Sequence, residues 1–288
     1  VTVGSSGALL VLYAILLNAH EQLLLPDPGY PCYKNFAAIL DIQPLLVPID
    51  QHGHYQLTVD KIKQYQNIKA IQIASPANPI GNVYPPAALK AIVEYCDDHA
   101  IYFISDELYH GLAYETAAQT ALAFSDNAIV VNGLSKYFSL PGLRLGWAIV
   151  PKNLVRKAEI VMQNVYISAP IISQQAALAA FDDAYLMSVT QMYRQRRDYL
   201  YAQLEQLFTI DAKPEGGFYI WANTTRYAED SLKFSQLLLD EIGVATTAGI
   251  DFGKNNTQNY LRFAYTRDVP HLQEGVRRLK QFLKPELL

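Results

Sequence analysis

The sequence predicts an α/β protein with a mostly parallel, doubly wound sheet, followed by a smaller C-terminal α+β unit. Three observations support this fold class. Short apolar or β-branched runs alternate with helical patterns from Val1 to about Val150, which is typical of a parallel sheet with helices on both faces. After Pro151 long helical stretches take over, and the tail mixes strands with helices. The length of 288 residues and a hydrophobic content of 51% are enough for a large core.

In the first half of the chain, short apolar runs define the strands, and apolar spacing defines the helices between them. The predicted strands are Val1–Val3, Gln22–Leu25, Leu45–Ile49, Ala70–Ala74, Ile101–Ser105, Ile129–Asn132 and Gly146–Val150. The predicted helices cover residues 8–20, 32–40, 58–66 and 86–98. The apolar run Ala8–Ala19 is shorter than the roughly 20 residues that a bilayer span needs, so we expect a buried helix there.

The second half is predicted to be mainly helical. Helices are expected over residues 152–165, 171–182, 188–208, 230–242 and 269–283, with strands at Gly217–Ala222, Val244–Thr247 and Tyr260–Ala264. Arg194, Arg196 and Arg197 are expected on the solvated face of the helix over 188–208. No Ser- or Gly-rich linker separates two units, and we place the domain boundary between residues 182 and 183.

Charge and cysteine content exclude several classes of partner. Lys and Arg total 23 against 27 Asp and Glu, for a net charge of -4, and no basic run could follow a phosphate backbone. We therefore expect no nucleic acid and no membrane partner. Cys32 and Cys96 lie far apart without metal-ligand or CxxC spacing, which predicts no metal site and favours a reducing, cytoplasmic compartment.

The turns that follow the predicted strands carry polar residues, and parallel sheets bind ligands at this edge. In VTVGSSG the backbone amides of Ser5 and Ser6 begin a helix, where an anion binds readily. An ordinary strand-to-helix turn is the alternative. Tyr30 in PDPGYPCY offers an aromatic face, and Asn78 in SPANPIG stands before a proline. For Tyr30 a core or surface tyrosine is the commoner explanation, and plain turn chemistry explains Asn78 about as well.

Two further turns complete the set. Asp106 and Tyr109 follow an apolar strand, and Lys136 lies eight residues before Arg144 around a Pro-Gly turn. Taken singly, the acid reads as a helix cap and the lysine as a solvated side chain. Taken together, the turns bring an anion cradle, an aromatic face, an amide, a carboxylate, a phenol, a lysine and an arginine to one edge. Pyridoxal 5'-phosphate needs this set, because it carries a phosphate, a pyridine ring, a phenolic oxygen and an aldehyde that condenses with a lysine.

Over essentially its whole length the sequence resembles the class I and II aminotransferases of fold type I. The most specific match is LSK followed by SLPGLRLG, and the D-E-x-Y and N-P-x-G segments agree with the family in order. The resemblance implies that Lys136 would form the Schiff base with the cofactor and that Asp106 would pair with the pyridine nitrogen. It also implies transfer of an amino group between an amino acid and a 2-oxo acid by a homodimer.

The same resemblance assigns the remaining site residues. Asn78 and Tyr109 would contact the phenolic oxygen, and Tyr30 would stack on the ring. The phosphate would be held by Ser5, Ser6 and Arg144. Arg262 in NYLRFAY, with Asn78, would bind the substrate carboxylate. In this family arrangement, residues 1–182 would form the large domain that binds pyridoxal phosphate, and residues 183–288 a small C-terminal domain.

The chain departs from the family pattern at three places. Gly133 stands where the family usually has a phosphate-binding serine, so the phosphate should depend more on the other contacts. Ala248 replaces the usual proline before Gly249–Gly253. The family also has a segment ahead of the first strand, so we expect the numbered chain to be a fragment or a processed form.

Two alternatives stay open from the sequence. A carbon–sulfur β-lyase or another Cα-carbanion enzyme of this fold needs the same lysine, aspartate and arginine. A non-catalytic domain that senses pyridoxal phosphate or an amino acid is the alternative from another class.

Overall fold

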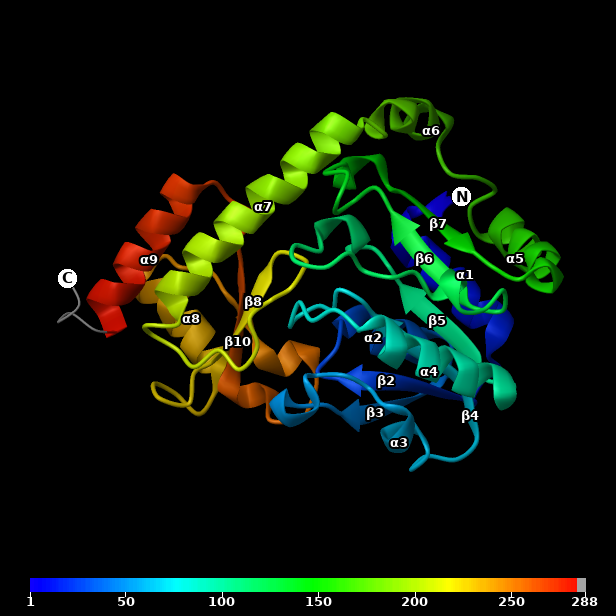
Figure 1. The fold of residues 1–288 in the computed structure, drawn as a ribbon, viewed down its shortest axis with the longest axis horizontal. Helices are drawn as coiled ribbons and strands as arrows, with labels where there is room; N and C mark the ends of the chain where they lie inside the picture. Colours follow the sequence, from blue (N-terminus) through cyan, green and yellow to red (C-terminus); the bar gives the residue numbers. More distant parts are fainter. Residues whose placement is uncertain (284–288) are drawn as a thin grey trace.

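A seven-stranded sheet and a three-stranded sheet organise the molecule, seen in a computed structural model that describes residues 1–283 (Figure 1). In spatial order, the larger sheet consists of β1 (Thr2–Val3), β7 (Leu145–Ile149), β6 (Ile129–Gly133), β5 (Tyr102–Asp106), β4 (Ile68–Ala74), β2 (Gln22–Asp27) and β3 (Gln43–Pro48). The strands from β6 to β3 pair in parallel, whereas β7 is antiparallel to both of its neighbours. The predicted mostly parallel sheet is confirmed.

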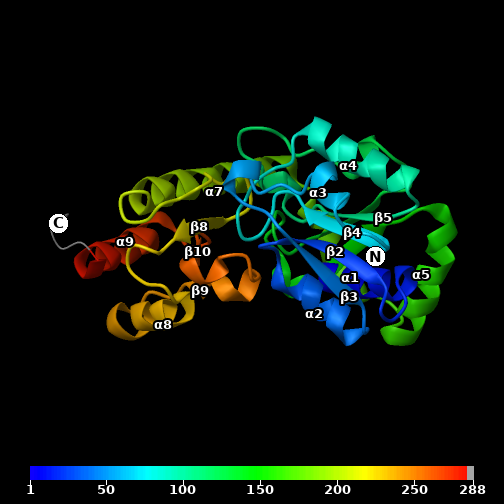
Figure 2. The ribbon, with the colours of Figure 1, turned by 90° about the horizontal axis from the view of Figure 1, so that it is seen from below.

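Helices cover both faces of this sheet, as Figure 2 shows for α2 and α4. On one face lie α1 (Gly4–Leu16), α2 (Pro31–Ile39) and α5 (Lys152–Val165), and on the other α3 (Val59–Ile62) and α4 (Pro86–Asp98). Side chains alternate between the two cores along the parallel strands, as β2 illustrates: Leu23 and Leu25 pack with α1, and Leu24 packs on the opposite side. This two-sided burial explains why the strands read as nearly continuous apolar runs.

The apolar run near the start of the chain forms a buried helix, as expected, but its bounds differ. Helix α1 begins at Gly4, directly after β1, and ends at Leu16 instead of residue 20. The Gly and Ser residues of its first turn carry no apolar signal, so the pattern placed the start too late. Within residues 1–283, no helix has the length and hydropathy needed to cross a membrane.

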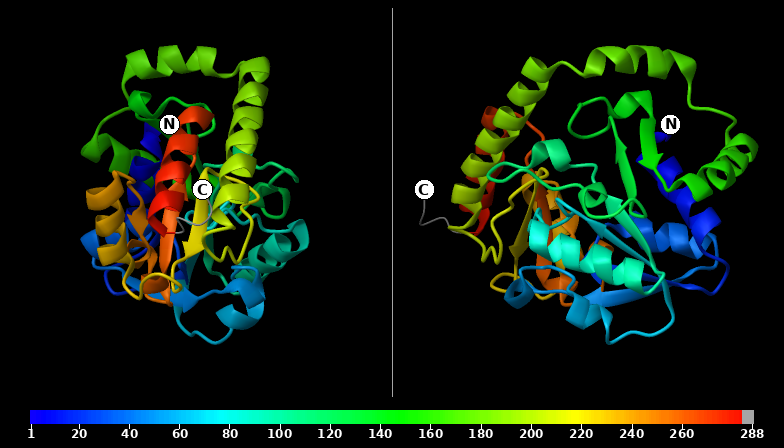
Figure 3. Two further views of the ribbon diagram at one scale, coloured as in Figure 1. Left: turned by 90° about the vertical axis from the view of Figure 1, so that its left-hand side faces the viewer. Right: turned by 45° about the vertical axis from the view of Figure 1, so that its right-hand side comes forward.

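The smaller sheet has the order β8 (Tyr219–Asn223), β10 (Tyr260–Ala264), β9 (Thr247–Ala248), and both pairings are antiparallel. Around it pack α7 (Asp183–Leu204), α8 (Ser231–Ile242) and α9 (Val269–Leu283). Figure 3 shows α7 running from α6 (Ile171–Ala177) to this sheet. The predicted strand Val244–Thr247 was wrong except for its last residue, because β9 is only a two-residue edge strand. The domain boundary at 182/183 falls at the start of α7 and stays a prediction.

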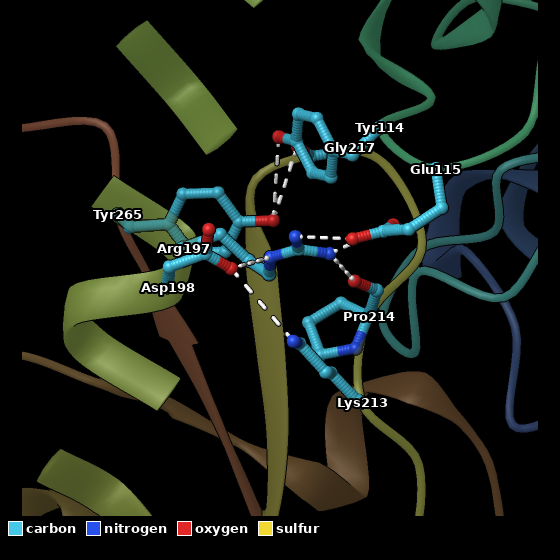
Figure 4. A network of polar contacts seen from close by, with 8 residues as sticks. All are labelled: Tyr114, Glu115, Arg197, Asp198, Lys213, Pro214, Gly217 and Tyr265. Atoms are coloured by element: carbon cyan, nitrogen blue, oxygen red, sulfur yellow. Dashed lines mark hydrogen bonds and ion pairs between the residues drawn. The ribbon is translucent and has the colours of Figure 1, made fainter. Parts of the chain in front are cut away.

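Arg197 contradicts the expectation that the arginines of α7 are solvated. Its side chain is 1% exposed, and its guanidinium donates hydrogen bonds to Glu115, to Asp198 and to the carbonyl oxygen of Pro214 (Figure 4). An arginine tolerates burial when carboxylates pair with it and its donors are used. Its main partner, Glu115, lies 82 residues away in the sequence, so the helical pattern of α7 could not reveal the pairing.

Candidate active site

A cavity of about 390 Å³ lies between the carboxyl ends of the parallel strands and the three-stranded sheet. Such an edge is where open α/β sheets bind ligands. The cavity brings together all nine residues that the sequence singled out: Ser5, Ser6, Tyr30, Asn78, Asp106, Tyr109, Lys136, Arg144 and Arg262. Their grouping is a structural fact, and their individual roles stay predictions.

One end of the cavity is suited to an anion. Ser5 and Ser6 lie in the first turn of α1. The first amides of a helix have no helical partners, and at the start of α1 no side chain among the described residues accepts their hydrogen bonds. Arg144 reaches the same place: a Cβ added to Gly4 would lie 2.6 Å from its Nη2 atom. Glycine at position 4 therefore leaves room for the guanidinium. Free amides, two hydroxyls and an arginine are the donor set that a phosphate requires.

Asp106 ends β5 and is 6% exposed. Its Oδ2 accepts a hydrogen bond of 2.5 Å from the Tyr33 hydroxyl, and its Oδ1 accepts one of 3.1 Å from the Leu108 amide. Burial raises the pKa of the Asp106 carboxyl, while these two hydrogen bonds and the charge of Lys136 oppose that rise. Within residues 1–283 it forms no ion pair. A buried, unpaired carboxylate on a cavity wall suits a cationic ligand group such as a protonated ring nitrogen.

Lys136 follows β6 and points its amine into the space between aromatic rings. Its Nζ atom lies 6.0 Å from the centre of the Tyr109 ring and 5.6 Å from that of Phe218. Burial lowers the pKa of this amine, and the charges of Arg262 and Arg144 add to that effect, while Asp106 opposes it. A lowered pKa increases the neutral, nucleophilic fraction of the amine, as attack on an aldehyde requires.

The side chains of Tyr109 and Asn78 are also held in place by hydrogen bonds. The hydroxyls of Tyr109 and Tyr219 are hydrogen-bonded at 3.3 Å. Burial raises the pKa of Tyr109 well above that of an ordinary tyrosine, so its hydroxyl keeps its proton near neutral pH. The Oδ1 atom of Asn78 accepts a hydrogen bond of 3.0 Å from Arg262, which leaves the amide nitrogen of Asn78 for another acceptor.

Arg262 enters the cavity from β10. Its Nη1 donates to Asn78 and its Nη2 to the Thr247 hydroxyl at 3.1 Å, while its buried Nε has no partner. The guanidinium carbon lies 4.0 Å from the centre of the Tyr219 ring and 4.8 Å from that of Phe252. Nη1 and Nη2 each keep a second N–H, and a guanidinium with such donors left over on a cavity wall is suited to a carboxylate.

Several residues of this site were missed from the sequence. Tyr33 donates a hydrogen bond to Asp106, and its ring packs edge-on to that of Tyr30. The two tyrosines are three residues apart in YPCY, and this spacing is the signal that could have linked them. Ser135 also lines the cavity, directly before the lysine. Tyr219 and Thr247 reach Arg262 only through strand pairing, and the local pattern carries no such signal.

Comparison with known proteins identifies one family. The family model "Aminotransferase class I and II" matches residues 1–279. The chain is 36% identical to a valine–pyruvate aminotransferase of Mycobacterium tuberculosis, covering 98% of this chain and 75% of that protein. It is 34% identical to a (5-formylfuran-3-yl)methyl phosphate transaminase of Methanocaldococcus jannaschii, covering 98% and 74%.

The fold agrees with solved structures as well. The crystal structure of an aminotransferase from Mycobacterium tuberculosis superposes with a TM-score of 0.94 at 34% identity, covering 99% of this chain and 75% of that one.

Proposed function

The chain belongs to the family of class I and II aminotransferases, and from this premise we propose that its cavity holds pyridoxal 5'-phosphate, bound through Lys136. The protein is an aminotransferase, which transfers an amino group between an amino acid and a 2-oxo acid. The observation that carries the cofactor proposal is the shared cavity of Lys136, with its lowered pKa, and the buried, unpaired Asp106. The uncapped start of α1 beside Arg144 supplies the matching anion site.

When bound, pyridoxal 5'-phosphate supplies a sink for the electron pair released as a substrate Cα–H bond breaks. In this proposal the Asp106 carboxylate holds the ring nitrogen in its protonated form by charge attraction. Tyr109 and the amide nitrogen of Asn78 donate hydrogen bonds to the phenolic oxygen, and Tyr30 contacts the ring. Ser5, Ser6 and Arg144 bind the phosphate.

The substrate is positioned from the three-stranded sheet. Arg262 binds the α-carboxylate and so sets the direction of the Cα–H bond. The neutral amine of Lys136 takes the Cα proton, because its lowered pKa suits it to act as a base near neutral pH. Tyr219 and Phe252 contact Arg262 and exclude water from one side of it.

We also propose that the chain acts as a homodimer in the cytoplasm, with domains at 1–182 and 183–288. A group of exposed apolar side chains on α5, α6, the start of α7 and the segments between them supports self-association, because a surface of this kind is usually covered. Its members are 46–85% exposed: Ile160, Val165, Ile167, Ile171, Ile172, Phe181 and Met187. Figure 1 shows α5 at the right-hand side of the molecule and α6 and the start of α7 at its top. The two unpaired cysteines support a reducing compartment.

Reductive labelling tests the cofactor proposal. The full protein is incubated with pyridoxal 5'-phosphate, reduced with borohydride, digested and analysed by mass spectrometry. We expect the label on Lys136, its loss in Lys136→Arg, and its retention in the control Lys157→Arg, which changes an exposed lysine of α5. Label on a different lysine would contradict the assignment. Product analysis checks the reaction: keto-acid-dependent amino transfer is expected, whereas pyruvate and ammonia from a thioether amino acid would indicate a lyase.

A further inference from the structure

Tyr219 contacts two residues of the proposed site but has no role in the mechanism above beyond shielding. We propose that it is a positioning residue for the substrate carboxylate, whose ring fixes the orientation of Arg262. This inference rests on the proposed function, because it takes Arg262 as the group that meets the carboxylate.

The pairing of the smaller sheet places Tyr219 beside the arginine. Arg262 on β10 is directly opposite Trp221 on β8 and Thr247 on β9. Tyr219 stands two residues before Trp221, so both side chains leave β8 on the same face. Tyr219 is thus the diagonal neighbour of Arg262, a position from which an aromatic ring can reach across a strand pair.

The contact is close and shielded. The guanidinium carbon of Arg262 lies 4.0 Å from the centre of the Tyr219 ring, and Tyr219 is 8% exposed. A guanidinium over an aromatic face is attracted by the negative charge of the ring, more strongly where water is excluded. The hydrogen bonds to Asn78 and Thr247 hold the two ends of the guanidinium. The ring adds a flat support that restricts how its plane can tilt.

Tyr219 is itself held from the other side of the cavity. Its hydroxyl is hydrogen-bonded to that of Tyr109, which follows β5 of the larger sheet, and the two rings meet edge to face. The orientation of Arg262 is therefore set relative to Tyr109, the residue proposed to contact the cofactor. Tyr219 thus connects Arg262, which is proposed to bind the substrate, to Tyr109, which is proposed to contact the cofactor.

The test compares Tyr219→Leu, which removes the ring, with Tyr219→Phe, which keeps the ring and removes the hydroxyl. Tyr227→Leu is the matched control, since Tyr227 packs on Phe208 and Phe234, away from the cavity. The probe is propionate, a carboxylate without an amino group. Its dissociation constant for the cofactor-loaded protein is measured by NMR titration, alongside cofactor affinity, thermal unfolding, and KM and kcat for the amino acid that wild type uses best.

We expect Tyr219→Leu to weaken propionate binding by about 5- to 30-fold, the range of a shielded cation–π contact. KM should rise by a similar factor, with cofactor affinity changed by less than about twofold. Tyr219→Phe should keep propionate affinity within about threefold of wild type, because the ring remains, and Tyr227→Leu should match wild type.

Unchanged propionate affinity in Tyr219→Leu would overturn the inference, as would an equal loss of propionate and cofactor affinity, which indicates a merely structural role. Arg262→Leu separates this failure from failure of the proposed function. If Arg262→Leu also leaves propionate binding unchanged, the assignment of Arg262 is wrong. If only Tyr219→Leu is without effect, the assignment stands and the positioning role is refuted.

Discussion

Replacing Asp106 by Asn should separate chemistry from stability more clearly than any other change in this molecule. Asn keeps the shape of the side chain and an oxygen that can accept from Tyr33 or Leu108, but it removes the negative charge. In the proposed site that charge faces a protonated ring nitrogen. At a separation near 4 Å and an effective dielectric constant near 20, such a pair is worth about 4 kcal/mol. Losing it would lower the pKa of the ring nitrogen by about three units.

The expected loss of rate follows from the same interaction energy. If most of the lost energy is felt when the Cα–H bond breaks, kcat should fall by about 1000-fold. The stability of the folded protein, in contrast, should not fall. Burial raises the pKa of Asp106 in the folded protein, so ionisation of this carboxyl at neutral pH opposes folding, and that cost fades as the pH falls through the folded pKa. The uncharged Asn avoids the cost, so we expect an equal or higher unfolding temperature at pH 7 for the cofactor-free protein, in which no ring nitrogen compensates the charge.

The assay is amino transfer to a 2-oxo acid under saturating cofactor, together with calorimetric unfolding of the cofactor-free protein. Asp126→Asn serves as the control, because Asp126 is exposed in the turn before β6. Turnover of Asp106→Asn within about tenfold of wild type would refute the reasoning and leave Asp106 as a structural cap. A large drop in unfolding temperature would show that its hydrogen bonds, not its charge, are what the fold requires.

Three further predictions follow from the same geometry. Arg262→Ala should raise KM for amino acids by about 10- to 150-fold, the range of one charge-assisted hydrogen bond, and loss of cofactor absorbance in this variant would contradict its assignment to the substrate. Because burial and nearby arginines lower the pKa of Lys136, its labelling by an amine reagent in the cofactor-free protein should begin at lower pH than that of free Nα-acetyl-lysine, and coincident pH profiles would argue against this. Glu115→Ala should lower the free energy of unfolding by about 1–3 kcal/mol in urea titrations, because it leaves the buried guanidinium with only Asp198 and the Pro214 carbonyl oxygen as acceptors among residues 1–283. Arg197→Met should cost less, and the reverse order would refute this account of the network.

Most of the nine residues chosen from the sequence meet in one cavity because of a simple property of parallel sheets. Asp106 and Lys136 come from segments that directly follow parallel strands, and the carboxyl ends of such strands share an edge. Locating the strands, even with errors of a few residues, was therefore enough to group the side chains. Arg262 was not reached in this way, since it lies on an antiparallel strand, and only the family resemblance pointed to it.

What could not be predicted depends on contacts between distant segments. Tyr219 and Thr247 meet Arg262 through the register of three antiparallel strands, and a slip of one residue would have turned them to the opposite face. The burial of Arg197 depends on Glu115 in the same way. Local periodicity predicts which face of an element is apolar, but it does not identify the polar partner that makes burial of a charge tolerable.

The way in which Arg262 is held has a consequence for the thermodynamics of substrate recognition. A long, flexible side chain that becomes ordered only when its ligand arrives costs about 0.5–1.5 kcal/mol of binding free energy in lost rotamer freedom. Here Asn78, Thr247 and the Tyr219 ring already order the guanidinium in the folded chain. Because that entropic cost is incurred during folding, more of the attraction between the arginine and the carboxylate remains as binding affinity. The ordered guanidinium can also favour one orientation of the amino acid as soon as it binds.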